Sequence, residues 1–161
     1  MTWTLSSARW RLWRVVDYGS HLPTLATAHR LRGPWHQALE FGSGDYSTSW
    51  FLELEELQLL VSVEADPDWR SRWQRRGDAR HHVLERRVTP AGFDVVLIDD
   101  GRSDGHPDGM QTRLETIHFV MPRRTGLVLV HDANVPEYVE ALDQYDPFQI
   151  VHTDPPTAVI V

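Results

Sequence analysis

Apolar and polar residues follow one another in blocks along the chain, and the blocks predict strands that alternate with helices. Short apolar runs without polar alternation are typical of buried strands. Such runs are Gln37–Phe41, Leu59–Val63, the weaker His82–Val88, "FDVVLID" and "GLVLVHD". The tail, "FQIVHTDPPTAVIV", predicts two further strands joined across Asp154-Pro155-Pro156.

The segments before and between these strands have the spacing of helices. They are Leu5–Val16, Pro23–Leu31, Thr48–Glu56, Pro67–Arg76, Met110–Met121 and Pro136–Tyr145. Pro67–Arg76 has the clearest ends, because Asp66 can cap its first turn, Pro67 suits the first helical position and Gly77 suits its end. Strands alternating with helices predict an α/β fold with a doubly wound, mostly parallel sheet.

Polar side chains gather where the predicted strands end. They are Glu40, Glu64, the pair Asp99-Asp100 and the pair His131-Asp132. In doubly wound sheets, ligands bind outside the carboxyl ends of the strands. The sequence therefore predicts a ligand site at this edge of the sheet.

Composition narrows the classes of function. The chain has 161 residues, the size of one ordinary domain, and no repeat or linker is apparent. Its net charge of −7 argues against a broad nucleic-acid surface, and the tryptophans of the local basic run "WRSRWQRR" have the spacing of a packed helix stripe with solvated arginines. Cysteine is absent, which excludes disulfides and thiolate metal sites.

No apolar run is long enough for a transmembrane helix, and we expect a cytoplasmic protein with no membrane partner. The sequence does not fix the oligomeric state and allows a homodimer.

The stretch "ALEFGSGDYS" places an acid, Glu40, just before Gly42 and Gly44. Glu64 follows Gly44 by twenty residues, where an acid can accept hydrogen bonds from both ribose hydroxyls of a nucleotide. A dinucleotide such as NAD fits poorly, because Ser47 stands where the third glycine of its fingerprint belongs and Glu40 would repel a pyrophosphate. A ligand with an ammonium group and no pyrophosphate, S-adenosylmethionine, fits better. An NAD-type oxidoreductase stays as the alternative.

"EFGSG", with Glu64, Asp99 and His131-Asp132 at the expected spacing, resembles the class I S-adenosylmethionine-dependent methyltransferases. "VVLIDDGRSDGHPDGM" and "LVLVHDANVPEY" further resemble the plant glucuronoxylan O-methyltransferases and related small O-methyltransferases. The resemblance implies a Rossmann-like, seven-stranded sheet of order 3-2-1-4-5-7-6 with one strand antiparallel and helices on both faces. We expect a single domain, 1–161, with a short helical cap over the cofactor side in residues 1–35 and the core in residues 36–161.

The resemblance also implies cofactor contacts. Gly42, Ser43 and Gly44 would pass beneath the methionine part, Glu40 would lie near its ammonium group, Glu64 would bind the ribose, and Ala65 and Asp66 would lie close to the adenine. Asp99 would be a further cofactor contact.

The candidate catalytic residues are Asp99, His131 and Asp132. Two interpretations stay open. Asp99 and Asp132, together with His131, hold Mg²⁺ or another divalent cation that lowers the pKa of an acceptor hydroxyl. Alternatively no metal is bound, Asp99 contacts the cofactor or the acceptor, and His131 is the base.

The expected acceptor is a small polar molecule that is methylated on oxygen, because His131 and the acids suit deprotonation of an alcohol and the loop of residues 100–109 is polar. Nucleic acid is an improbable partner at this net charge. A non-catalytic S-adenosylmethionine-binding module remains a further alternative.

Overall fold

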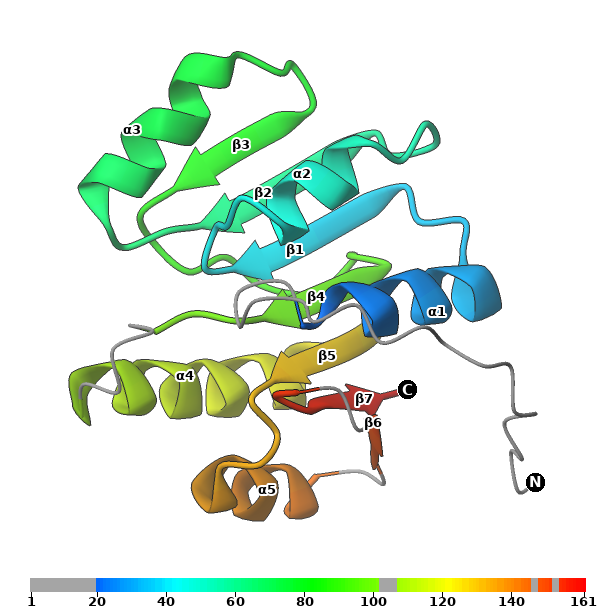
Figure 1. Ribbon diagram of the computed structural model, residues 1–161, viewed down its shortest axis with the longest axis vertical. Coiled ribbons are helices and arrows are strands. Elements are labelled where there is room, and N and C mark those ends of the chain that lie inside the picture. Colours follow the sequence, from blue (N-terminus) through cyan, green and yellow to red (C-terminus); the bar gives the residue numbers. More distant parts are fainter. Residues whose placement is uncertain (1–19, 102–106, 146–147, 152–153) are drawn as a thin grey trace.

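The computed structural model describes residues 20–101, 107–145, 148–151 and 154–161, and within them it shows a seven-stranded sheet of order β3-β2-β1-β4-β5-β7-β6 (Figure 1). The strands are β1 Gln37–Phe41, β2 Leu59–Val63, β3 His81–Leu84, β4 Val95–Ile98, β5 Leu127–His131, β6 Phe148–Val151 and β7 Thr157–Ile160. Strands β1 to β5 pair in parallel, and β7 is antiparallel to both β5 and β6. The predicted fold class and strand order are confirmed.

Five α-helices and a short 3-10 helix flank the described strands. They are α1 Leu22–Arg32, α2 Ser47–Leu52, α3 Pro67–Arg76, α4 Pro107–Val120, η2 Met121–Arg123 and α5 Pro136–Asp143. The predicted ends of α3 are confirmed, because the Asp66 carboxylate accepts hydrogen bonds from the backbone of Asp68 and Trp69, and Gly77 has a φ of 67°. The predicted helix Leu5–Val16 and the loop residues 102–106 lie outside the described residues.

Several predicted elements are shorter in the structure, and two of them end four residues earlier than predicted. The helix expected to reach Glu56 ends at Leu52, where Glu53, Glu55 and Glu56 follow. Negative charge is unfavourable at the carboxyl end of a helix. The strand expected to reach Val88 ends at Leu84, which pairs with Val63, the last residue of its neighbour β2. Beyond that point this edge strand has no partner strand.

Two apolar layers cover the two faces of the sheet. Leu25 and Ala28 of α1 and Phe51 of α2 pack on one face, and Ile117 of α4 and Leu142 of α5 belong to the core on the other. Helix α1 thus lies along one face of the sheet (Figure 1), and Ser20, two residues before its start, contacts His131 at the carboxyl end of β5. The division of the chain into a cap of residues 1–35 and a core of residues 36–161 stays a prediction. No helix among the described residues is long and apolar enough to cross a membrane.

Candidate functional site

The glycine loop after β1 brings two strand ends into close contact. Gly42 has a φ of 85°, and a Cβ atom there would lie 2.6 Å from the backbone oxygen of Asp99. Only glycine fits this conformation and this gap. Gly44 differs, because its Cβ would meet only Ser47 Oγ, at 3.7 Å. The backbone therefore does not require glycine at position 44, and the missing side chain leaves open space beside the loop.

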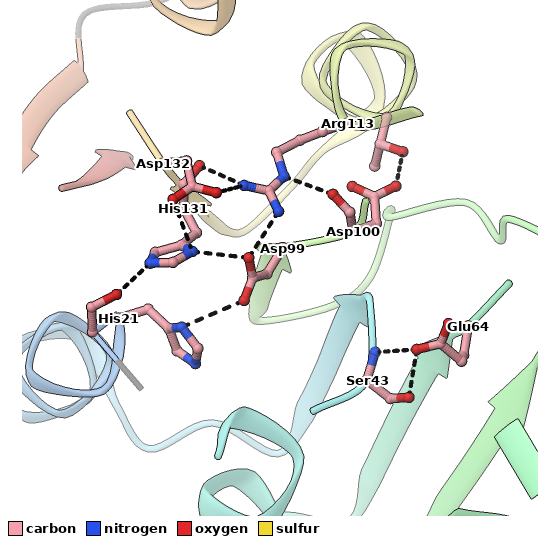
Figure 2. Close-up of polar contacts among 10 residues, drawn as sticks. His21, Ser43, Glu64, Asp99, Asp100, Arg113, His131 and Asp132 are labelled. Atoms are coloured by element: carbon pink, nitrogen blue, oxygen red, sulfur yellow. Dashed lines mark hydrogen bonds and ion pairs between the residues drawn. The ribbon is translucent and has the colours of Figure 1, made fainter. Parts of the chain in front are cut away.

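Glu64, directly after β2, is held against this loop by two hydrogen bonds from Ser43 to one of its carboxylate oxygens (Figure 2). Its Oε2 accepts from the Ser43 backbone N at 2.9 Å and from Ser43 Oγ at 2.7 Å. Its Oε1 accepts from the backbone N of Asp66 at 2.8 Å. The acid predicted for ribose binding thus lies beside the glycine loop, and both of its oxygens retain further lone pairs. The carboxylate of Asp66 caps α3, so Asp66 faces this region with its backbone.

Glu40 is fully buried beneath the same loop. Its Oε1 accepts hydrogen bonds from Thr48 Oγ1 at 2.6 Å and from Ser62 Oγ at 2.5 Å. Thr48 also accepts from the backbone N of Gly44, which connects Glu40 to the glycine loop. The second oxygen, Oε2, is buried and has no hydrogen-bond partner within the described residues.

Burial raises the pKa of Glu40 to about 7, and the nearby hydroxyls of Ser62, Thr48 and Ser47 offset only part of the rise. A buried carboxylate with a free oxygen and a raised pKa is stabilised by a cation placed beside it. No atom of Glu40 is exposed, so a positive group bound beside the glycine loop would act on this carboxylate across the loop and not by direct contact.

A second group of charged residues lies at the carboxyl ends of β4 and β5 (Figure 2). At its centre is Arg113 of α4, which sequence analysis did not single out. Its Nη2 donates to Asp99 Oδ1 at 3.0 Å, its Nη1 donates to Asp132 Oδ2, and its Nε donates to the backbone oxygen of Asp100 at 2.7 Å. Asp132 has a φ of 58°, a conformation that few residues other than glycine adopt.

His131 connects this group to the turn that precedes α1. Its Nδ1 lies 2.9 Å from Asp99 Oδ1, and its Nε2 lies 2.6 Å from Ser20 Oγ. Burial opposes ionisation of Asp99, but the hydrogen bond from His131 and the charge of Arg113 outweigh it and hold the pKa of Asp99 well below its usual range. Asp99 is therefore a carboxylate at any physiological pH, and it favours the His131 tautomer that carries its proton on Nδ1.

His21 completes the group. Its Nδ1 lies 3.5 Å from Asp99 Oδ2, but neither ring nitrogen has hydrogen-bond geometry with a described residue. Burial lowers the pKa of His21 to about 4, although Asp99 opposes the shift, so at neutral pH this contact is not an ion pair. His21, Asp99 and His131 each place a ligand atom within 4.8 Å of the others.

The structure brings Asp99 and Asp132 together as predicted, but not around a space for a cation. Both carboxylates bind the guanidinium of Arg113. The Mg²⁺ site expected at Asp99 and Asp132 is therefore not supported. The sequence does hold one signal for Arg113: it is a cation in the helix that follows the strand just before Asp99. Ser20 and His21 gave no such signal, because they lie more than a hundred residues from His131 in the sequence.

Comparison with known proteins reveals the fold. A scan of protein-family models and a search of curated proteins both find no match. Among solved structures, the methyltransferase domain of bacterial CtHen1 matches with a TM-score of 0.61 and 12% identity, over 87% of this chain and 96% of that domain. The 1,6-didemethyltoxoflavin-N1-methyltransferase of Burkholderia thailandensis, bound to S-adenosylhomocysteine, matches with a TM-score of 0.54 and 22% identity, over 89% of this chain and 77% of that one. The fold is that of the class I methyltransferases.

Spermidine synthase from Thermotoga maritima also matches, with a TM-score of 0.59 and 12% identity, over 89% of this chain and 59% of that one. Because structures named for different reactions share this fold, the fold alone does not fix the reaction. The expected resemblance to plant glucuronoxylan O-methyltransferases is not shown by these comparisons.

Proposed function

We propose that the protein binds S-adenosylmethionine and transfers its methyl group to an oxygen of a small polar acceptor. The observation that carries the proposal is the arrangement of Glu64, Ser43 and Gly42 on β1 and β2, beside the Asp99–His131 pair on β4 and β5. Strands β2 and β4 flank β1, so the two groups are separated by two strand spacings, about 10 Å. A nucleoside bound at Glu64 can therefore extend its other end over the glycine loop toward Asp99.

The chain offers a contact for each part of the cofactor. Glu64 accepts hydrogen bonds from the ribose hydroxyls, Gly42 to Gly44 lie beneath the methionine part, and Glu40 stabilises the ammonium group. Ala65 and the backbone of Asp66 lie next to Glu64, where the adenine is expected. Asp99, at the end of β4, faces the methionine end.

The bound cofactor supplies an electrophilic methyl group. The chain must then orient the acceptor hydroxyl and take its proton. His131 suits this role, because Asp99 accepts from Nδ1 and leaves the lone pair of Nε2 for the acceptor. In the structure the hydroxyl of Ser20 lies against Nε2, so an acceptor hydroxyl reaches this nitrogen either in place of Ser20 or through it. Asp132 binds Arg113 through Oδ2, and its Oδ1 lies 3.6 Å from His131 Nδ1.

Calorimetric titration with S-adenosylhomocysteine tests the cofactor assignment. We expect saturable binding by the wild-type protein and a loss of at least tenfold in affinity in Glu64→Ala. Glu55→Ala is the matched control, because Glu55 is an exposed acid on the loop before β2. Absence of binding by the folded wild-type protein would refute the proposal, and preferential binding of NAD would favour the oxidoreductase.

A panel assay that follows S-adenosylhomocysteine release tests the acceptor. We expect turnover on hydroxylated small molecules. Turnover only on nucleic acid or on a protein amine would contradict the proposed acceptor class. Cofactor binding without turnover on any class would favour a non-catalytic binding module.

A further inference from the structure

We propose that Arg113 is a built-in cation, which takes the place of a divalent metal ion between the ends of β4 and β5 and positions the Asp99–His131 pair. What that pair does rests on the proposed function. The place of the guanidinium does not, because it follows from the contacts of Arg113 alone.

The guanidinium uses all three of its nitrogens at this point. Nη2 binds Asp99, Nη1 binds Asp132 and lies 3.3 Å from the backbone oxygen of His131, and Nε binds the backbone oxygen of Asp100. The side chain of Arg113 is only 8% exposed. A planar fork of donors that joins two carboxylates and two carbonyls does what a metal ion with oxygen ligands would do.

The balance of charge leaves little attraction for a second cation here. Asp99 and Asp132 carry two negative charges when ionised, and Arg113 neutralises one of them. Arg113 occupies one oxygen of each carboxylate, Asp99 Oδ1 and Asp132 Oδ2. A divalent ion that bridged the two carboxylates would lie against the guanidinium, and like charges repel at contact distance. Burial opposes the charge of Arg113, but Asp99 and Asp132 more than compensate, so the pKa of Arg113 is raised and the group stays protonated.

Arg113 also determines how Asp99 meets His131. Asp99 Oδ1 accepts from both Arg113 and His131, so the guanidinium fixes the carboxylate in the orientation that the imidazole uses. Arg113 does not contact the acceptor face of His131 at Nε2, which lies beside Ser20. It is therefore a positioning residue.

The test is a Mn²⁺ titration, followed by electron paramagnetic resonance, of the wild-type protein, Arg113→Met and Arg113→Lys. We expect no saturable binding by the wild-type protein or by Arg113→Lys, which retains a cation. Arg113→Met frees Asp99 and Asp132, and we expect it to bind Mn²⁺ at least tenfold more tightly than the wild-type protein. Adding Asp99→Asn should abolish the gain. A residue that only stabilised the fold would not change cation binding in this way.

Arg80→Met is the matched control, because Arg80 also binds an aspartate and several backbone oxygens, but far from this site. It should gain no Mn²⁺ affinity. If Arg113→Met does not fold, Arg113→Gln replaces it. A folded, neutral variant at position 113 that gains no affinity would overturn the proposal.

Zn²⁺ binding is a separate test, because imidazole ligands favour Zn²⁺ over Mn²⁺. Tight Zn²⁺ binding by the wild-type protein that is lost in His21→Ala would overturn the proposal, since it would show a metal beside the guanidinium at His21, Asp99 and His131. A parallel titration with S-adenosylhomocysteine separates the two proposals. If the wild-type protein does not bind S-adenosylhomocysteine, the proposed function is refuted, but the Mn²⁺ titration still tests the role of Arg113.

Discussion

Replacing Glu40 by Gln should change how the stability of the protein depends on pH. The fold raises the pKa of Glu40 from its ordinary value of 4.5 to about 7. A carboxyl group whose pKa is higher in the folded state prefers to be protonated there. Its contribution to stability is therefore complete below about pH 4.5 and is lost as the pH rises toward 7. Above that range the loss is constant.

The magnitude follows from the size of the shift. A difference of about 2.5 pKa units corresponds to about 3 kcal/mol of unfolding free energy, of which about 2 kcal/mol is lost between pH 5 and pH 8. Glu40→Gln cannot ionise, so it does not lose this amount. The amide of Gln also places an unpaired buried donor near the position of Oε2. This lowers the stability of Glu40→Gln by an amount that does not change with pH. The informative quantity is thus the difference between the two proteins at each pH.

Urea unfolding of both proteins at about pH 5 and about pH 8 measures this difference. We expect the wild-type protein to lose about 2 kcal/mol relative to Glu40→Gln between the two conditions. Other titrating groups are shared and cancel. Glu55→Gln, an exposed control, should show no such relative change. A difference between the wild-type protein and Glu40→Gln that stays constant with pH would refute the assignment of a raised pKa to Glu40.

The same group links cofactor binding to protons. With a pKa of about 7, Glu40 is about half protonated at neutral pH, and an ammonium group beside it favours the ionised form. Binding of S-adenosylhomocysteine near pH 7 should therefore release up to about half a proton in the wild-type protein and none from this position in Glu40→Gln. Calorimetry in buffers of different ionisation enthalpy measures the release. Equal release by both proteins would contradict an electrostatic interaction between Glu40 and the ammonium group.

Three further outcomes are expected. Gly42→Ala should lower the unfolding free energy by about 2 kcal/mol or more and weaken S-adenosylhomocysteine binding, because the new Cβ meets the backbone oxygen of Asp99 in a strained conformation. A urea midpoint equal to that of the wild-type protein would contradict this. Asp66→Ala should lower stability by about 1 kcal/mol through loss of the α3 cap, and an unchanged urea midpoint would contradict that role. Once an acceptor is known, wild-type turnover should be insensitive to EDTA and abolished in His131→Ala, and EDTA-sensitive turnover would instead support a metal mechanism.

The fold and the place of Glu40 and Glu64 at one edge of the sheet could be predicted from sequence because their signals are local. Glu40 and Glu64 follow apolar strands directly, and parallel strands place their carboxyl ends at one edge. The sequence pattern also places Ser43 and Glu64 near each other, since both follow strands that end at that edge. The hydrogen bonds of the buried Glu40 could not be predicted, because their donors, Thr48 and Ser62, belong to different elements.

The acceptor side was predicted less well because its contacts are distant in the sequence. Spacing places Asp99 and Asp132 at neighbouring strand ends, which suggests a metal when only the strands are considered. Whether a helix inserts a cation between them depends on the packing of α4 against β4 and β5. The sequence around Arg113 does not predict that its side chain will bind Asp99 and Asp132.

The two ends of the site differ in how their charges are balanced, and this difference orients a ligand. Beneath the glycine loop, Glu40 has a buried oxygen with no hydrogen-bond partner among the described residues, so a positive group bound above the loop would be attracted to its ionised form. At the other end, Asp99 already has Arg113 and His131, and Asp132 has Arg113. A cation there gains little, whereas a neutral hydroxyl can use the lone pair of His131 Nε2. Under the proposed function, this difference in charge balance would orient the amino-acid part of the cofactor toward β1 and an uncharged, hydroxylated acceptor toward β5.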